Sequence, residues 1–359
     1  MLDILTMLEE CWANQTCAAI ATIIDKKGST YRGTGAKSVI LPDGTIVGTL
    51  SGGCVEGDIY EHAKGVIESG IPQLKLYDFH GEGDLIWGLG VGCNGSLKIW
   101  IEPFDPVRQK SQALQTLEIF RNQLPSATII SSDRPVRYPI GAKFLLGDTQ
   151  TDLPIPSEAG LFTIQHDAVQ LELYIEKLKY IPRLIIFGAG PDVVPLVRGA
   201  KLLQWLVTIV DHRPGYANQE RFPEADEIIV SPIGAYPSGL LVDEKDYVVI
   251  MTHHYQQDAL FLHQMLTYPL AYIGILGPRK RTEQLLGEWT LLEGVSLHSP
   301  IGLDIQAETP EEIALSILSE IICHVNKGSG GSLKSRVGPI HENGELTKDG
   351  TAETKSRSW

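Results

Sequence analysis

The stretch that decides the fold runs from residue 183 to residue 211 and reads RLIIFGAGPDVVPLVRGAKLLQWLVTIVD. A short apolar run ends at the turn Gly188-Ala189-Gly190, a helical pattern follows, and a second apolar run ends at Asp211. A strand, a glycine turn, a helix and a strand in this order form the repeating unit of a doubly wound parallel sheet. Three more apolar segments are predicted to be strands of the same sheet, at Glu227–Val230, Tyr247–Met251 and Tyr272–Leu276. We therefore expect a Rossmann-like domain over residues 181–326.

The glycine turn matches the first part of a dinucleotide fingerprint. Gly188 and Gly190 would let backbone N–H groups at a helix N-terminus face a phosphate. Asp211 follows Gly190 by 21 residues, where such an acid accepts from a ribose hydroxyl. However, Val193 replaces the third glycine and Pro191 interrupts the loop. The pattern predicts either a nucleotide site or a tight turn that serves only the sheet.

More polar residues follow the predicted strands of this domain. They are Thr252, His253 and His254 after one strand, Gly277, Arg279, Lys280 and Arg281 after the next, and His298 and Asp304 further on. We expect all of them near the carboxyl edge of the sheet, where Arg279 and Arg281 would bind a phosphate. The alternative for this basic run is a solvated helix start. The two adjacent histidines would point to opposite faces of a strand, which disfavours a metal site.

The first half of the chain predicts a mixed α+β domain over residues 1–180. A helical pattern covers 4–12, a buried strand follows within 16–25, and Pro42-Asp43-Gly44 supplies the turn of a hairpin. A strand at Leu97–Glu102 and a helix over 107–124 continue the pattern. The whole chain is therefore expected to be α/β, with this domain followed by the doubly wound parallel sheet and by a tail over 327–359, rich in Gly, Ser and charges, that we expect to be disordered.

Two glycine-rich segments of the first domain carry cysteines. In GTLSGGCVEGD, residues 48–58, Gly52 and Gly53 precede Cys54, and a helical pattern begins there. A thiolate at a helix start has a lowered pKa and could bind a soft metal such as molybdenum, attack a persulfide or hold sulfur. The alternative is a small buried cysteine. Glu56 and Asp58 are assigned to the helix terminus. The second glycine-rich segment is WGLGVGCNG, residues 87–95, in which Gly92 precedes Cys93.

Composition narrows the class of protein. The chain has 359 residues with 44 acidic and 30 basic side chains, a net charge of −14, so a nucleic-acid partner is not expected. Five scattered cysteines without a CxxC pair predict reduced thiols. We find no apolar run of membrane-spanning length and no signal-peptide pattern, and these features predict a cytoplasmic protein.

Six motifs in order resemble the XdhC/CoxI family, the accessory factors of xanthine dehydrogenase and related molybdenum hydroxylases. They are GSTYRGTGAKSVILPDGTIVGTLSGGCVEGDI, WGLGVGCNGSLKIWIEPF, RLIIFGAGPDV, DHRPGYANQERFPEAD, GILGPRKR and SPIGLDIQAETPEEIALSILSEI. Two departures stand out: Pro191 replaces the histidine that usually follows the Rossmann turn, and Asn94 precedes Gly95 in the second motif.

The resemblance implies a homodimeric chaperone rather than a catalyst. Such a protein binds molybdenum cofactor (molybdopterin), protects it during sulfuration with a cysteine desulfurase, and delivers it to an apo-hydroxylase such as xanthine dehydrogenase. The family role falls on the elements around Cys54 and Cys93, with Cys54 as the candidate metal ligand. We expect these elements to hold the molybdenum end of the cofactor while the Rossmann crevice holds the pterin phosphate or a nucleotide. The alternative is an NAD(P)-dependent oxidoreductase that uses Gly188, Gly190 and Asp211.

Overall fold

The computed structural model describes residues 1–28, 30–53, 55–79, 95–147, 152–178, 180–287, 289 and 295–335. Three predicted site residues, Cys54, Gly92 and Cys93, lie outside these ranges, as do residues 336–359 of the predicted tail.

A five-stranded sheet in the order β3-β2-β1-β5-β4 forms the first part of the chain. Its strands are β1 (Ala18–Gly28), β2 (Lys37–Ile40), β3 (Ile46–Gly48), β4 (Gln73–Asp78) and β5 (Gly95–Phe104), and neighbouring strands are antiparallel throughout. The apolar residues of α1 (Leu2–Ala13) and α3 (Lys110–Asn122) pack on one face, and those of α2 (Glu56–Ser69) pack on the other. The predicted helices, the buried strand and the hairpin are confirmed.

A second, four-stranded antiparallel sheet in the order β7-β6-β9-β8 follows α3. Its strands are β6 (Ser126–Ser132), β7 (Lys143–Leu145), β8 (Gly160–His166) and β9 (Val169–Glu176). Trp100 of β5 packs with Ile130 and Tyr174 of this sheet, so a small apolar cluster joins the two sheets. The mixed α+β character expected of this half of the chain is therefore present in two sheets.

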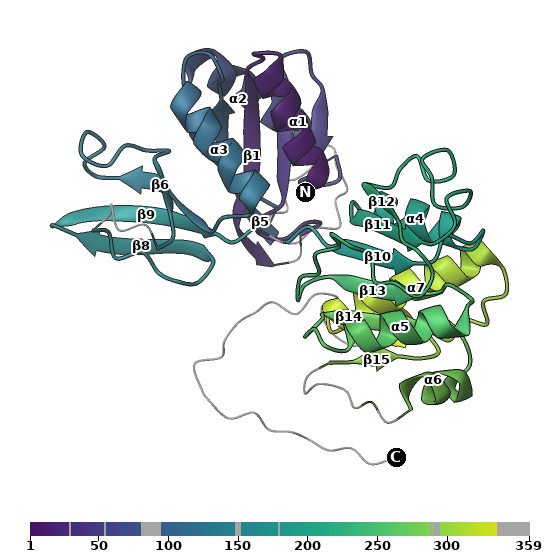
Figure 1. Ribbon diagram of the computed structural model, residues 1–359. Coiled ribbons are helices and arrows are strands. Elements are labelled where there is room, and N and C mark those ends of the chain that lie inside the picture. The colour runs from purple at the N-terminus through teal and green to yellow at the C-terminus, as the bar shows by residue number, and fades with distance from the viewer. Residues whose placement is uncertain are drawn as a thin grey trace.

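The third sheet is parallel and six-stranded, in the order β12-β11-β10-β13-β14-β15. Its strands are β10 (Arg183–Phe187), β11 (Leu206–Asp211), β12 (Glu227–Val230), β13 (Tyr247–Ile250), β14 (Tyr272–Ile275) and β15 (Leu297–His298). Helices α4 (Val193–Leu202) and α7 (Pro310–Val325) supply the core on one face, and α5 (Tyr255–Met265) with α6 (Arg279–Leu286) on the other (Figure 1). The predicted doubly wound parallel sheet is confirmed.

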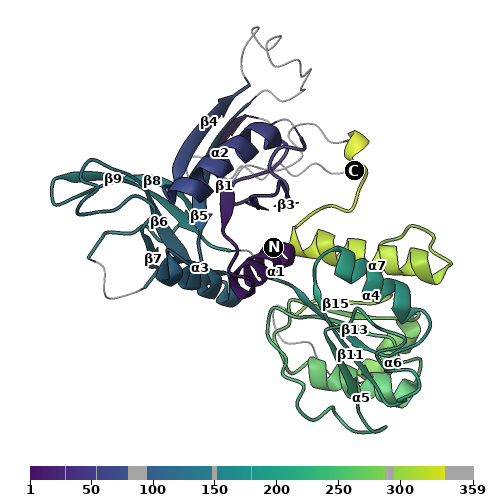
Figure 2. The same cartoon turned by 90° about the horizontal axis from the view of Figure 1, so that it is seen from above.

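The first domain meets the parallel sheet at the amino ends of its strands. The amino group of Met1 donates to Gln204 Oε1 at 2.7 Å, and Gln204 lies just before β11. The N–H of Ile181, just before β10, donates to Gln123 Oε1 at 3.3 Å. Figures 1 and 2 both show the first domain on this side of the sheet. Within one chain, the carboxyl edge of the sheet therefore faces away from the first domain.

Among the described residues, no helix is both long enough and apolar enough to cross a bilayer.

Candidate functional site

The strand order reverses between β10 and β13, and this switch point is where open parallel sheets bind ligands. The turn after β10 needs glycine at its first position for two reasons. Gly188 has φ +129°, and a Cβ there would lie 2.5 Å from the carbonyl oxygen of Met251. Glycine thus lets the turn pass directly against the end of β13.

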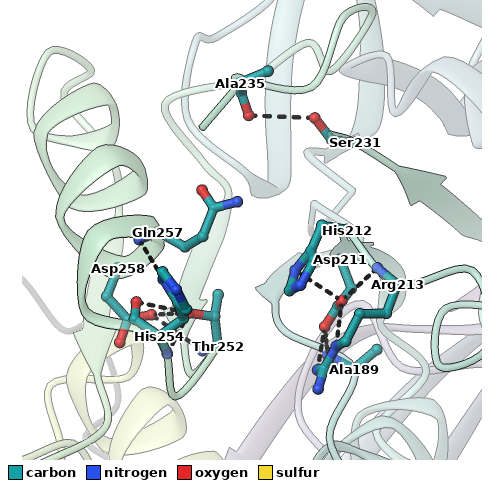
Figure 3. A network of polar contacts seen from close by, with 10 residues as sticks. All are labelled: Ala189, Asp211, His212, Arg213, Ser231, Ala235, Thr252, His254, Gln257 and Asp258. Atoms are coloured by element: carbon teal, nitrogen blue, oxygen red, sulfur yellow. Dashed lines mark hydrogen bonds and ion pairs between the residues drawn. The ribbon is translucent and has the colours of Figure 1, made fainter. Parts of the chain in front are cut away.

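Asp211 lies at the end of β11 as predicted, but its carboxylate is already used within the chain. Oδ1 accepts from the backbone N–H and the Nε of Arg213, both at 2.9 Å. Oδ2 accepts from the N–H of Ala189 at 2.8 Å and from a terminal guanidinium nitrogen of Arg213 at 2.7 Å (Figure 3). A carboxylate offers about four lone-pair positions, so no acceptor remains for a ribose hydroxyl.

The environment of Asp211 stabilises its charged form. Burial opposes ionisation, but the hydrogen bonds and charge of Arg213 and the N–H of Ala189 outweigh it and hold the pKa of Asp211 below its ordinary value. The Asp211 side chain is 1% exposed. The Asp211–Arg213 ion pair has no net charge, and Asp211 holds the glycine turn through its hydrogen bond to the N–H of Ala189.

The two adjacent histidines do not lie on a strand, because β13 ends at Ile250. His253 has φ +59° and an exposed ring whose Nε2 lies 2.8 Å from Oδ2 of Asp192, in the turn after β10. His254 is the N-cap of α5, and its Nδ1 accepts from the N–H of Gln257 at 3.4 Å. The alternation rule therefore does not apply, and both histidines lie in the turn after the carboxyl end of β13.

The arginines of the basic run after β14 lie in different environments: Arg281 is paired with a buried acid, whereas Arg279 is exposed. Arg281 donates to Oδ2 of Asp258 at 2.6 Å, and Asp258 is 1% exposed. Arg281 and His253 line a pocket of about 260 Å³ at this edge. Arg279 is exposed and lies 3.2 Å from Glu283 on its own helix. The structure thus brings Gly188, Gly190, Asp211 and Arg281 to one edge, while Arg279 points into solvent on α6.

We expect His298 near the same edge, and it is the last residue of β15, but its ring does not face the crevice. Its ring stacks on Tyr272, the first residue of β14, with centroids 4.4 Å apart. Its Nδ1 lies 3.4 Å from Oε1 of Glu320 on α7. Packing on a residue at the amino end of β14 holds His298 away from the crevice.

The glycine loop of the first domain is organised by Glu56. Its carboxylate accepts from the N–H and hydroxyl of Ser51 and from the N–H of Gly53, the two N–H contacts measuring 2.8 and 2.9 Å. Gly52 and Gly53 have φ +72° and +112°, and the ring of Tyr31 lies 3.4 Å from where a Cβ of Gly52 would stand. Burial opposes the charge of Glu56, but the Ser51 and Gly53 hydrogen bonds hold its pKa below the ordinary value.

Helix α2 begins at Glu56, two residues after Cys54 in the sequence, and Val55 is its N-cap. The assignment of Glu56 to the helix terminus therefore describes its position but misses its role in the loop. Asp58 instead accepts from the hydroxyl of Tyr77 at 2.7 Å. The sequence analysis also missed Arg213, although a cation two residues after Asp211 could have indicated an ion pair with that carboxylate.

The fold and these two turns define a class of two-domain protein: an α+β domain with a glycine-rich cysteine loop, followed by a Rossmann-type domain whose acid is internally paired. Two family models match the chain, described as "XdhC and CoxI family" over residues 11–78 and "XdhC Rossmann domain" over 184–321. The chain belongs to the XdhC and CoxI family.

Individual relatives cover nearly the whole chain. A Bacillus subtilis protein, named as a probable subunit of xanthine dehydrogenase, is 34% identical over 330 residues, which span 88% of this chain and 96% of that protein. The Escherichia coli "Molybdenum cofactor insertion chaperone PaoD" is 22% identical over 85% of this chain and 82% of its own length. A crystal structure of a protein described as a xanthine dehydrogenase, from Bacillus halodurans, has a TM-score of 0.74 and 33% identity, covering 93% of this chain and 99% of that one.

Proposed function

We propose that this protein is an accessory factor that binds molybdenum cofactor, supports its sulfuration and delivers it to a xanthine dehydrogenase-type hydroxylase. The observation that carries the proposal is family membership with nearly full-length relatives. One of them is named as a molybdenum cofactor insertion chaperone, and another is named as belonging to a xanthine dehydrogenase. A cysteine desulfurase is the sulfur donor in this proposal, and the working state is a homodimer.

The loop over residues 50–53 supports the first half of the proposal. Its glycines adopt positive φ, and a Cβ at Gly53 would meet none of the described residues within 4 Å, which leaves room for a ligand to approach the backbone there. Cys54 follows directly in the sequence and would supply a thiol to the molybdenum or to its sulfur ligand. Gly92 and Cys93 would supply the second thiol element. The cofactor is cargo in this scheme and leaves with the client.

The expected single cleft, shared by the cysteine loop and the Rossmann crevice, needs correction. The first domain contacts the amino ends of the parallel strands, whereas the crevice lies at their carboxyl ends. Among the described residues of one chain, the loop over residues 50–53 and the crevice therefore do not share a cleft. We place the cargo at the first domain and assign no part of it to the crevice of the same chain.

The test is co-elution of purified molybdenum cofactor with the protein in size-exclusion chromatography, detected by molybdenum content. Cys54→Ala and Cys93→Ala should each lower the retained molybdenum severalfold. Cys323→Ala is the matched control, because this free thiol lies in the Rossmann domain. Equal retention by wild type, Cys54→Ala and Cys93→Ala would remove the thiols from the proposal, and no retention by wild type would reject cofactor binding itself.

Within the part of the chain that the structure describes, no specific contact favours the NAD(P)-dependent oxidoreductase. That alternative rested on an acid free to accept from a ribose, and Asp211 has its acceptor positions filled by Arg213 and Ala189. Calorimetric titration with NAD(H) and NADP(H) tests the point directly, and binding at submillimolar cofactor would restore the alternative.

A further inference from the structure

A groove between α4 and α7 lies outside both glycine turns. These two helices lie side by side on one face of the parallel sheet (Figures 1 and 2). The groove has a volume of about 520 Å³. Its walls come from both helices, from the turn after β10 and from the loop after β11, and they include Pro191, Arg198, Arg221, Glu311, Leu315 and Leu318. Pro191, which replaces the usual family histidine, is part of this wall.

The floor of the groove is apolar and its depth depends on small residues. A Cβ at Gly199 would lie 2.4 Å from Cδ1 of Leu318, so the Leu318 side chain packs directly on the backbone of α4. Leu318 is 4% exposed, whereas Leu315 on the rim is 61% exposed. A large exposed leucine beside an apolar floor is typical of a surface that a partner covers.

Two arginines of the groove have no carboxylate partner among the described residues. Most other described arginines form ion pairs: Arg108, Arg121, Arg137, Arg183, Arg213, Arg279 and Arg281. Arg198 is exposed, and the Nε of Arg221 is buried without a hydrogen-bond acceptor in the described part of the chain. Neither guanidinium has a hydrogen-bond acceptor among the described residues, so both are available to an anion that a partner brings to the groove.

Arg221 is held ready for such an anion. Its guanidinium carbon lies 4.7 Å from the centroid of the Tyr216 ring, and that of Arg213 lies 4.1 Å from the same ring. Stacking on the ring fixes the guanidinium without consuming its hydrogen-bond donors. The arrangement reduces the conformational entropy that Arg221 would lose on binding.

From these observations we infer that the α4–α7 groove docks the hydroxylase client through a segment that carries both acidic and leucine-type side chains. The inference rests on the proposed function for the identity of the partner. Its own argument is charge complementarity: in a chain of net charge −14, two unpaired cations beside an apolar floor select a partner that is acidic at that point. Glu311, at the edge of the groove, disfavours partners that are uniformly acidic and requires the acids to face Arg198 and Arg221.

The experiment measures binding of the full chain to purified apo-hydroxylase by biolayer interferometry at low and high salt. Arg198→Glu/Arg221→Glu should weaken binding about 30-fold, and Leu315→Asp about 10-fold, because both changes remove central contacts of the interface. The wild-type affinity should fall with salt, and the double variant should lose most of that dependence. Arg221→Lys should fall between, since it keeps the charge without the planar fork.

Matched controls separate docking from general effects. Arg134→Glu changes another exposed arginine that forms no ion pair with the described residues, and Leu202→Asp changes a leucine on α4 that is 85% exposed and outside the groove. Both should bind within about twofold of wild type. Thermal unfolding of every variant checks the fold, and Leu315→Asp provides an independent test if the Arg221 variants do not fold.

Each outcome bears on the inference. Groove variants that bind the hydroxylase like wild type would overturn it, as would groove variants that change only the self-association of the chain, since the groove would then be a face between copies. Molybdenum retention is measured on the same samples. Wild type that retains cofactor but binds no hydroxylase would reject the docking groove alone, whereas hydroxylase binding that depends on the groove without cofactor retention would reject the cofactor role alone.

Discussion

Two glycine turns of this protein, one in each domain, are each held by a carboxylate that accepts from backbone N–H groups, but the two carboxylates have different surroundings. The turn Gly188-Ala189-Gly190 and the loop over residues 50–53 both point backbone N–H groups toward a negative charge, and in each case that charge is a carboxylate of the chain itself. Asp211 closes the first turn and Glu56 closes the second. An anion-binding pattern in the sequence is therefore satisfied internally at both places.

The difference lies in where each carboxylate comes from and what else it contacts. Asp211 reaches its turn from a neighbouring strand, is buried, and is paired with Arg213. Glu56 belongs to the first turn of the helix that follows its loop, is partly exposed, and forms no ion pair with the described residues. The Rossmann turn is thus neutral and fixed by the sheet, whereas the loop before Cys54 depends on one side chain and can rearrange more easily. The comparison favours the loop as the adaptable ligand site.

The largest effect should follow from Asp211→Asn. An amide cannot accept all four hydrogen bonds, and the substitution removes the buried carboxylate that is the counter-charge of the partly exposed Arg213 guanidinium. We expect a loss of about 4 kcal/mol in the free energy of unfolding. Urea denaturation at pH 7 measures it, with Glu224→Gln as an exposed control. A loss as small as that of the control would show that Asp211 does not fix the turn.

The two turns should also differ in their tolerance of alanine. Gly188→Ala adds a Cβ at 2.5 Å from a backbone oxygen on top of a positive φ, so we expect a loss of about 3 kcal/mol. The Cβ added by Gly53→Ala would meet none of the residues that the structure describes within 4 Å, so we expect only the cost of its φ of +112°, about 1 kcal/mol. Thermal unfolding of the two variants compares them. Equal losses would contradict the view that only the Rossmann turn is enclosed by neighbouring backbone.

Much of this fold could be predicted because its signals are local. The capping box of α7 is an example: Thr309 accepts from the N–H of Glu312, the Glu312 carboxylate accepts in return, and Pro310 occupies the first turn. The alternation and turn chemistry of the β2–β3 hairpin are equally local. Such contacts depend on residues a few positions apart, which a sequence displays directly.

The site was harder to predict because its partners come from distant elements. Arg281 looked like a free cation, yet it pairs with Asp258, 23 residues earlier, and His298 packs on Tyr272 and Glu320 instead of reaching the crevice. Sequence shows which charges exist, but pairing in three dimensions decides which of them are available to a ligand. Likewise, the sequence does not show that Arg221 lacks a carboxylate partner among the described residues. Only the ion pairs seen in three dimensions show this.

The smallest effect concerns Glu56 and acidity. Because its pKa is lowered in the folded chain, its contribution to stability is present above its ordinary value of 4.5 and is lost as the pH falls through the lower folded value. Glu56→Gln should cost about 1 kcal/mol at pH 7, a modest amount because the side chain is partly exposed and screened. Asp211 also has a lowered pKa, but its ordinary value is 3.8, so its loss begins at lower pH.

Urea midpoints at pH 7, 5, 4 and 3.5 separate the two carboxylates. Wild type should lose stability below pH 5, first through Glu56 and then through Asp211, whereas Glu56→Gln should lack the first part of that loss. Glu68→Gln changes an exposed acid of the same helix and should follow the wild-type curve. If Glu56→Gln kept the full acid loss, the loop before Cys54 would not depend on the charge of Glu56, and the contrast between a fixed and an adaptable turn would need another cause.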